Sequence, residues 1–455
     1  MPDVDALRDR MSEERIEFVD LKVADLLGRW RHVTVPSARF DASVVERGIA
    51  FDASNLGYAS VEGSDMRLRP DLGTATVAEE DGDRVLSVIC DVYPAASDEP
   101  FRDDPRGIAR RTERLALRET GADDVRLSPE LEFYVFQEAR FVSDECSSGY
   151  TIDPMSGRSG LSFYHICPPE DRLLALRNGI CRELHNRGIA VRYHHHEVGA
   201  RGQQEIELGF HGVVEAADAT LLAKQATRRL AADRGWVATF LPKPLHGQNG
   251  SGLHVHQYLG KGGTSLFEGN GGLSELALCY VGGILSHGRS LCALTNASTN
   301  SYRRLVPGYE APVWFAFGEG NRSAAVRIPR YADAKERRIE LRTVDATCNP
   351  YLAYSAMVLA GLDGIRRGLN AEQLGFGPFA EDLYRLDAER ASRLAAAPRS
   401  LGEALDSLEQ DHDYLVHDGV FSADQVAQWI RAKRREVTAV GHRPHPYEFS
   451  LYFDL

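Results

Sequence analysis

The chain has 455 residues, of which 43% are hydrophobic and 26% charged, and its formal net charge is −13 at pH 7. A chain of this length can bury a large core and suggests two or more domains. The negative charge argues against non-specific nucleic-acid binding and gives no support for docking on anionic membranes. No apolar run approaches transmembrane length, and the first ten residues do not resemble a signal peptide. Seven cysteines without CxxC spacing indicate reduced thiols, so we expect a cytoplasmic protein.

The first hundred residues are rich in β-prone segments. Arg15–Pro36 contains two such runs separated by the turn-like LLGR, which predicts a hairpin. Asp91–Asp104 is rich in Pro, Ser and Asp and is a plausible domain boundary. A helix is then expected to begin at Pro105, with one of the two preceding aspartates as its N-cap, and to stop at Gly121.

Strand-like and helical patterns alternate through the middle of the chain. Strands are predicted over residues 126–137, 190–198, 203–210 and 251–259, and helices over 169–188 and 218–235. This alternation favours an α/β or α+β catalytic domain built on a broad sheet. Residues 400–437 are predicted to be helical, with acidic residues early and basic residues late, as helix dipoles favour.

Pairs of potential metal ligands recur at a spacing of two residues in the predicted strands. They are Glu130 and Glu132, Glu205 and Glu207, and His254 and His256, and HHHE at 194–197 adds a fourth cluster. Side chains two apart on a strand share a face and lie about 6.5–7 Å apart, so one pair can contact two neighbouring ions. Oxygen-rich ligands with one imidazole favour Mg²⁺ or Mn²⁺, whereas a thiolate-free site with more histidines would favour zinc. A solvated polar strand is the alternative for any one pair, but four clusters favour a di-metal site.

Basic residues gather within forty positions of an otherwise acidic chain. They are Arg303, Arg304, Arg322, Arg327, Lys335, Arg337, Arg338 and Arg342. Guanidinium groups bind carboxylate and phosphate bidentately, and beside divalent cations they indicate phosphoryl transfer. The alternative is a set of surface ion pairs. No P-loop motif is present, which excludes nucleotide binding by that route.

Five long motifs resemble bacterial type I glutamine synthetase: KPLHGQNGSGLHVH, NSYRRLVPGYEAP, NRSAAVRIP, RRIELR and TCNPYLAYSAMVLAGLDG. The similarity extends from FVDLKVADLLGRWRHVTVP to HPYEFSLYFDL, nearly the whole chain. It implies an α+β fold, with a small N-terminal β-grasp domain at 14–100. A large catalytic domain at 105–455 would contain a broad antiparallel sheet flanked by helices. It also implies a homo-oligomer, a dodecamer of two hexameric rings with active sites between subunits.

The resemblance further implies an ATP-dependent ligase that joins ammonia to the γ-carboxylate of L-glutamate through γ-glutamyl phosphate. One divalent cation would be held by Glu132, Glu197 and Glu205, and the other by Glu130, His254 and Glu340. The glutamate contacts would be Asn249, Gly250, Arg304 and Arg342. The contacts to ATP and the transferring phosphate would be His256, Arg322, Arg327 and Lys335, with Arg338 as a weaker candidate. The histidine run would be supporting structure, and Glu207 receives no role.

The remaining implied roles concern the nitrogen substrate. Glu310 would lie on a flap that keeps water from the intermediate. Asp52, from the adjacent subunit, would take a proton from ammonium, and Tyr164 would line the ammonium pocket. Together with Arg322 and Arg342, Asp52 and Glu310 form the expected catalytic set.

The chain departs from the family pattern around the nitrogen and adenine sites. Asn55 stands where a serine is usual, an aromatic-rich VWFAFGEG follows the flap, and Arg192 and Tyr258 replace residues associated with ATP. The acceptor is therefore ammonia or, alternatively, a primary amine of the methylamine, ethanolamine, polyamine or aniline type. A third interpretation is a catalytically silent scaffold. Loss of metal ligands would mark such a protein, and all six expected ligands are present. Tyr384 lies near a position adenylylated in some relatives, and we expect it to be an ordinary packed tyrosine.

Overall fold

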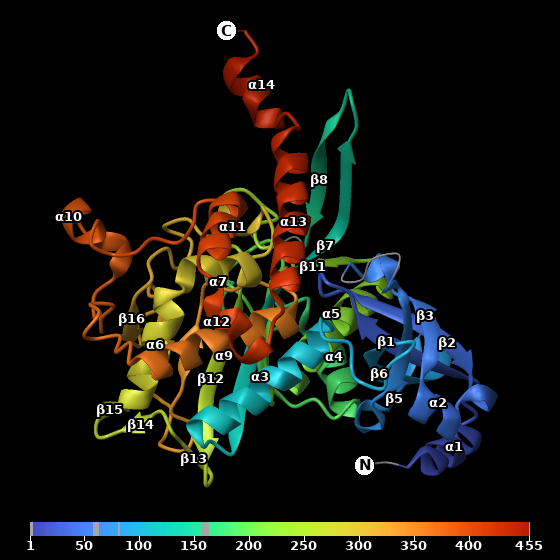
Figure 1. Ribbon diagram of the computed structural model, residues 1–455. Coiled ribbons are helices and arrows are strands. Elements are labelled where there is room, and N and C mark those ends of the chain that lie inside the picture. Colours follow the sequence, from blue (N-terminus) through green and yellow to red (C-terminus); the bar gives the residue numbers. More distant parts are fainter. Residues whose placement is uncertain (1–2, 58–62, 81, 156–162, 455) are drawn as a thin grey trace.

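The computed structural model describes residues 3–57, 63–80, 82–155 and 163–454 (Figure 1). Its N-terminal part is a sheet in the order β2-β1-β6-β4-β3, with β5 paired to β6. β1 lies antiparallel to β2, which confirms the predicted hairpin, and parallel to β6. The elements of this part are α1 (Val4–Glu13), β1 (Phe18–Ala24), β2 (Trp30–Pro36), α2 (Ala42–Arg47), β3 (Ile49–Asp52), β4 (Asp65–Pro70), β5 (Thr76–Glu80) and β6 (Asp83–Pro94).

The β1–β2 turn docks on the catalytic part of the chain. Gly28 in this turn has φ +74°, and a Cβ there would lie 2.7 Å from the Cα of Asn349, so only glycine fits. The side-chain amide of Asn349 donates to the carbonyl oxygens of Asp25 and Leu26 at 3.2 and 3.1 Å. The two parts of the molecule are therefore joined by main-chain contacts as well as by apolar packing.

A ten-stranded sheet forms the centre of the catalytic part, in the order β16-β17-β18-β12-β7-β10-β9, with β8 and β11 on β7 and β13 on β12. Every pairing is antiparallel except that of β16 with β17, which is parallel. Its strands are β7 (Asp124–Ser143), β8 (Ser148–Pro154), β9 (Val191–His196), β10 (Gln203–Leu208), β11 (Val237–Thr239), β12 (Leu253–Lys261), β13 (Thr264–Ser265), β16 (Phe317–Glu319), β17 (Val326–Ile328) and β18 (Ile339–Leu341). A separate short hairpin pairs β14 (Glu268–Gly269) with β15 (Gly272–Leu273).

The catalytic part also contains helices, most of which pack around this sheet, whereas the last one extends away from it (Figure 1). They are α3 (Pro105–Thr120), α4 (Leu174–Asn186), α5 (Val213–Ala232), α6 (Glu275–Ser286), α7 (Gly288–Thr295), α8 (Ser301–Arg304), α9 (Pro350–Arg367), α10 (Ala388–Ala391), α11 (Leu401–Gln410), α12 (Asp413–Val416), α13 (Ala423–Gly441) and α14 (Pro446–Tyr452). Residues 400–437 are largely helical, as predicted. No helix among the described residues has both the length and the apolar character needed to cross a bilayer.

Helix α3 matches the prediction at both ends. Asp104 caps it by accepting from two main-chain N–H groups, and Gly121 ends it in the left-handed region. The boundary segment predicted at Asp91–Asp104 begins later than expected, because Asp91–Pro94 belong to β6. Asp91 holds that strand end against α3 through ion pairs with Arg106 and Arg110.

Two other predicted helices differ at their starts. Helix α4 begins at Leu174 rather than Pro169, because the Asp171 carboxylate accepts from the Leu173 N–H and binds Arg177, which holds the preceding residues in turns. Helix α5 begins at Val213, five residues early, because the Glu215 carboxylate accepts from the Gly212 N–H at 2.9 Å and caps the first turn.

Candidate active site

The strand register of the large sheet brings the paired ligand residues together. Glu130 on β7 lies opposite His254 on β12 and Glu207 on β10, and Glu132 lies opposite Glu205. Opposed residues of antiparallel strands point to the same face of the sheet. The pairs on neighbouring strands therefore lie side by side on one face of the sheet, and their carboxylates and imidazoles form the floor of one cavity.

The cavity has a volume of about 550 Å³. All six residues expected to bind metal line it: Glu130, Glu132, Glu197, Glu205, His254 and Glu340. Asn249, Gly250, Arg304, Tyr164, Glu310, Arg322, Arg327 and Arg342 line it as well. The structure thus brings most of the predicted site residues into one place.

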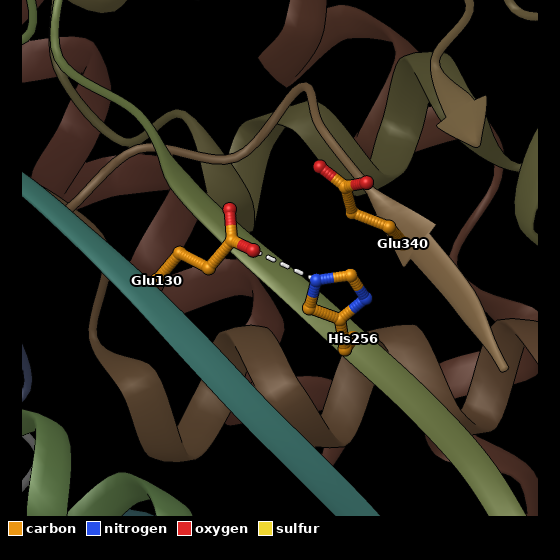
Figure 2. A group of neighbouring side chains, drawn as sticks. All are labelled: Glu130, His256 and Glu340. Carbon is orange, nitrogen blue, oxygen red and sulfur yellow. Dashed lines mark hydrogen bonds and ion pairs between the residues drawn. The ribbon is translucent and has the colours of Figure 1, made fainter. Parts of the chain in front are cut away.

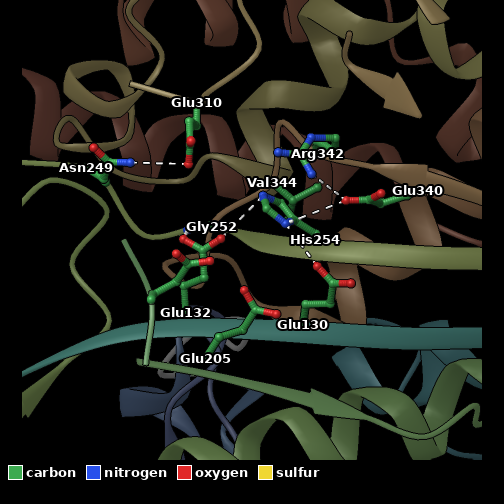
Figure 3. Close-up of polar contacts among 12 residues, drawn as sticks. Glu130, Glu132, Glu205, Asn249, Gly252, His254, Glu310, Glu340, Arg342 and Val344 are labelled. Carbon is green, nitrogen blue, oxygen red and sulfur yellow. Dashed lines mark hydrogen bonds and ion pairs between the residues drawn. The ribbon is translucent and has the colours of Figure 1, made fainter. Parts of the chain in front are cut away.

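One possible cation site lies between β7, β12 and β18. Glu130, His256 and Glu340 offer ligand atoms within 4.8 Å of one another, and His256 Nε2 is 2.7 Å from Glu130 Oε1 (Figure 2). His254 lies beside them, with Nδ1 3.1 Å from Glu130 Oε2 and 3.7 Å from Glu340 Oε1 (Figure 3). The expected triad with His254 is thus close together, and His256 is an additional candidate ligand.

A second possible site lies between β9, β10 and the residue after β9. His195, Glu197 and Glu205 offer ligand atoms within 4.8 Å of one another. His195 Nε2 is 3.4 Å from Glu205 Oε1. Glu132 approaches from β7, and its Oε1 is 3.7 Å from His254 Nε2, between the two groups. The family resemblance implies that the histidine run is supporting structure. The spacing of two residues between His195 and Glu197 nevertheless indicates that their side chains share a face.

Buried donors hold Glu132 in place. Its Oε2 accepts from the Gly252 N–H at 2.8 Å and from Gln203 Nε2 at 3.2 Å. The same Gln203 amide donates to the Gly250 carbonyl at 2.9 Å, and its oxygen accepts from the Gly199 N–H at 2.8 Å. Gln203 is 1% exposed and was missed by sequence reasoning, because a glutamine carries no metal-ligand signal.

The carboxylates repel one another where no cation of the protein balances them. Burial, together with the charges of Glu132 and Glu205, raises the pKa of Glu197 to about 9. Burial and the charges of Glu130 and Glu132 likewise raise the pKa of Glu205. Without metal, these buried carboxylates therefore resist ionisation. Divalent cations bound among them would supply positive charge and favour the ionised form, so this set of carboxylates and imidazoles fits a metal site.

On the β18 side, arginines supply the balancing charge. Burial opposes the ionisation of Glu340, but Arg342 and Arg327 beside it lower its pKa to about 2. Arg342 Nη1 lies 2.7 Å from Glu340 Oε1, and Arg327 Nη1 contacts the other oxygen. Within the described chain, Nε of both arginines is buried without a hydrogen-bond partner. Both arginines line the cavity and place positive charge beside any anion bound there.

Arg304 is fastened to the main chain. Its guanidinium donates to the carbonyl oxygens of Thr343 at 2.8 Å and Arg342 at 3.0 Å, and it is 3% exposed. Gly250 packs against it, since a Cβ on Gly250 would lie 2.7 Å from Arg304 Cγ. These contacts leave Arg304 at the cavity wall as a fixed positive charge.

An aromatic and basic group borders the β9 and β10 side. The guanidinium carbons of Arg192 and Arg338 lie 5.5 and 5.6 Å from the ring centre of Phe210, and Tyr258 meets the same ring edge-on. Arg338 is 1% exposed, and among the described residues its Nε and Nη2 have no hydrogen-bond partner. Arg192 forms an ion pair with the buried Glu207, which gives that glutamate a structural role.

Three predicted site residues lie off the cavity wall. His256 is fully buried and bonded to Glu130, and Lys335 is on an exposed turn. Asp52 lies on β3 of the N-terminal sheet, where its carboxylate accepts from the Ser54 N–H and hydroxyl at 2.8 and 3.0 Å. Tyr164, by contrast, lines the cavity, whereas residues 156–162 before it lie outside the described part of the chain. All described residues that line the cavity come from the catalytic part.

Comparison with known proteins agrees with this geometry. Residues 15–95 match the family described as "Glutamine synthetase, beta-Grasp domain", and residues 102–452 match "Glutamine synthetase, catalytic domain". The chain is 42% identical to a glutamine synthetase of Streptomyces coelicolor, with 99% of each chain covered, and 40% identical to one of Methylococcus capsulatus, with 98% of each covered. Among solved structures, it is similar to the cryo-EM structure of Plasmodium falciparum glutamine synthetase (TM-score 0.88, 27% identity, 99% of each chain) and to "Apo GmaS without ligand" (TM-score 0.83, 27% identity, 100% of each chain). The chain therefore belongs to the glutamine synthetase family of ATP-dependent ligases.

Proposed function

We propose that this protein joins ammonia to the γ-carboxylate of L-glutamate, with conversion of ATP to ADP and phosphate. The observation that carries the proposal is one cavity in which glutamates and histidines of five strands and a loop converge beside buried arginines. Such a cavity suits an anionic substrate and the transfer of a phosphoryl group. Curated relatives that this chain matches over 98–99% of their length, at about 40% identity, bear the name glutamine synthetase.

Two divalent cations, Mg²⁺ or Mn²⁺, would supply charge neutralisation for the phosphoryl group when bound. Glu132, Glu197 and Glu205 would hold one of them, with His195 as a further candidate ligand. Glu130, His254 and Glu340 would hold the other, with His256 behind them. The crowding that raises the pKa of Glu197 and Glu205 supports this assignment, because it favours exchange of protons for cations.

In the first step an oxygen of the γ-carboxylate attacks the γ-phosphorus of ATP, and ADP leaves. Asn249, Gly250, Arg304 and Arg342 hold the glutamate. Arg304 presents a charge already fixed by main-chain carbonyls. Arg322 and Arg327, which line the same cavity, contact the transferring phosphate. His256 and Lys335 stay as predicted nucleotide contacts, and Phe210 with Arg338 offers a ring and a buried cation on the adenine side.

In the second step nitrogen attacks the γ-carbonyl carbon, and the bond from that carbon to the bridging oxygen breaks, so phosphate leaves. Asp52, supplied by the adjacent subunit, takes the proton that ammonium must lose. Hydrogen bonds from the Ser54 main chain and side chain hold the pKa of Asp52 below its usual range, so it is ionised at neutral pH. Tyr164 lies at the cavity wall and stacks on His165, with 3.9 Å between the two ring centres. In this position it can line the ammonium pocket.

We also propose a homo-oligomer of two hexameric rings with active sites between subunits. The position of Asp52 outside the cavity of its own chain supports this arrangement. Helix α14 and the β7–β8 hairpin project from the body of the molecule (Figure 1) and expose Tyr447, Phe449, Phe453 and Phe141. Aromatic side chains of this kind are typical of subunit contacts. The seven free cysteines support a cytoplasmic location.

The test measures phosphate release from ATP and L-glutamate with Mg²⁺, and compares ammonium with a panel of primary amines by kcat/KM. We expect ammonium to be preferred by at least about tenfold, a difference of about 1.4 kcal/mol in transition-state binding. Preference for an amine would replace the proposal with a γ-glutamyl amine ligase. No turnover with any acceptor, from protein that binds Mn²⁺ and ATP, would overturn both.

A further inference from the structure

Three consecutive residues at the rim of the cavity contact two other segments of the chain. The Tyr309 ring lies 3.7 Å from Lys243 Nζ. Glu310 Oε2 accepts from Asn249 Nδ2 at 3.3 Å (Figure 3). The Ala311 carbonyl accepts from the hydroxyl of Tyr384 at 2.9 Å. The first two contacts come from the loop that leads into β12, whereas the third comes from a segment more than seventy residues later.

The conformation of this rim needs external support. Glu310 has φ +60°, in the left-handed region that residues with a side chain rarely adopt. Such conformations persist only where surrounding contacts hold them. The side chain of Glu310 is exposed, and its contact with Asn249 is a side-chain hydrogen bond open to solvent. The main-chain contact to Ala311, which is 1% exposed, is therefore well placed to decide where Glu310 points.

Tyr384 is itself held firmly. It lies in the 3₁₀ turn η5 (Leu383–Arg385), where its N–H donates to Asp382 Oδ1 at 3.0 Å. The Leu383 N–H donates to Ser323 Oγ at 2.9 Å, and the Asn321 amide donates to the Phe379 carbonyl at 2.9 Å. Asn321 and Ser323 flank Arg322, which lines the cavity. The hydroxyl of Tyr384 thus connects the segment of this arginine to the rim that carries Glu310.

We propose that Tyr384 is a positioning residue, which holds Glu310 over the cavity through the Ala311 carbonyl and so keeps water from the acyl phosphate. The inference rests on the proposed function, because only that reaction forms an acyl phosphate. Burial raises the pKa of Tyr384 to about 12, so the hydroxyl stays protonated and able to donate across the neutral range. The residue acts through the rim and does not itself touch the reacting atoms.

Loss of this contact has a defined chemical consequence. When the rim opens, a water oxygen attacks the γ-carbonyl carbon in place of nitrogen, the bond to the bridging oxygen breaks, and glutamate and phosphate are released. ATP is then consumed without amide formation. A neutral hydrogen bond shifts such an equilibrium by a factor of about two to ten, which sets the expected size of the effect.

The test compares Tyr384→Phe with the wild-type assembly in two measurements. The first is the ratio of phosphate released to amide formed at saturating ATP and glutamate, over a range of ammonium concentrations. The second is the rate of cleavage after Glu310 by a glutamate-specific protease, followed by mass spectrometry of the fragments. We expect both to rise about two- to tenfold in Tyr384→Phe. Tyr354→Phe is the matched control, because it removes a buried hydroxyl bonded to Thr220 at 2.7 Å, between α9 and α5.

If Tyr384→Phe is cleaved after Glu310 at the wild-type rate, the hydroxyl does not hold the rim. If cleavage is faster but the ratio of phosphate released to amide formed is unchanged, Tyr384 does not help to exclude water. An equal rise in Tyr354→Phe also overturns that role in water exclusion, because the effect would then follow general loosening. A wild-type protein that releases no phosphate in response to glutamate overturns the proposed function instead. In that case cleavage after Glu310 still shows whether the contact exists.

Discussion

Gln203 offers a test of whether the carboxylate array binds metal. Its side-chain amide is buried between the Glu132 carboxylate, the Gly250 carbonyl and the Gly199 N–H. Gln203→Leu keeps the approximate volume and removes all three hydrogen bonds. If Glu132 is a metal ligand, the substitution leaves that carboxylate less well oriented for a cation, although no ligand atom is lost.

The magnitude follows from the contacts that remain. Loss of a residue that orients a metal ligand typically weakens metal binding about 10- to 100-fold. Glu132 keeps the Gly252 N–H at 2.8 Å as a second donor, which places the effect near the lower end, at about 10- to 30-fold. This corresponds to about 1.4–2 kcal/mol of binding free energy. The orphaned Gly199 N–H and Gly250 carbonyl also lower the thermal midpoint.

The assay is calorimetric titration of the metal-free protein with Mn²⁺, together with thermal unfolding. Gln425→Leu serves as the control, since Gln425 is also 1% exposed and its amide donates to the Asp103 carbonyl at 2.9 Å, away from the cavity. We expect both variants to lose thermal stability and only Gln203→Leu to bind Mn²⁺ more weakly. Affinity within twofold of wild type in a folded Gln203→Leu protein would refute the reasoning.

Two further predictions concern charges outside the cavity. Arg106 is 4% exposed and pairs with Asp71, Asp91 and Asp218 at 2.8–3.0 Å. Arg106→Met leaves Asp71 and Asp91 with Arg110 alone as a cationic partner and Asp218 with the Tyr351 hydroxyl, so it should cost about 3–5 kcal/mol, seen as a lower denaturation midpoint. A midpoint equal to the wild type's would contradict this. Burial opposes protonation of His287, but hydrogen bonds to Asp411 and Asp363 raise its pKa. The stability that protonated His287 contributes is therefore fully present below its unfolded-state pKa of about 6.5, and is lost as pH rises through its higher folded-state pKa. The thermal midpoint of the wild type should fall over that pH range, and that of His287→Gln should change less.

Much of the site could be read from local patterns. The E-x-E and H-x-H spacings place both members of each pair on one strand face, whatever the rest of the fold does, because side chains alternate along a strand. The start and end of α3 were equally local, since Asp104 and Gly121 satisfy the helix termini themselves. The family resemblance then ordered these pieces into a fold, and the comparisons confirmed the family.

Only the tertiary structure decided which pairs meet. The register sets Glu132 opposite Glu205 and Glu130 opposite His254, although these residues are more than seventy and more than one hundred and twenty positions apart. It also made His195 a neighbour of Glu205 and turned Gln203 toward Glu132. The physical reason is that alternation along one strand depends on the chain's own geometry, whereas contacts between strands depend on how distant segments align.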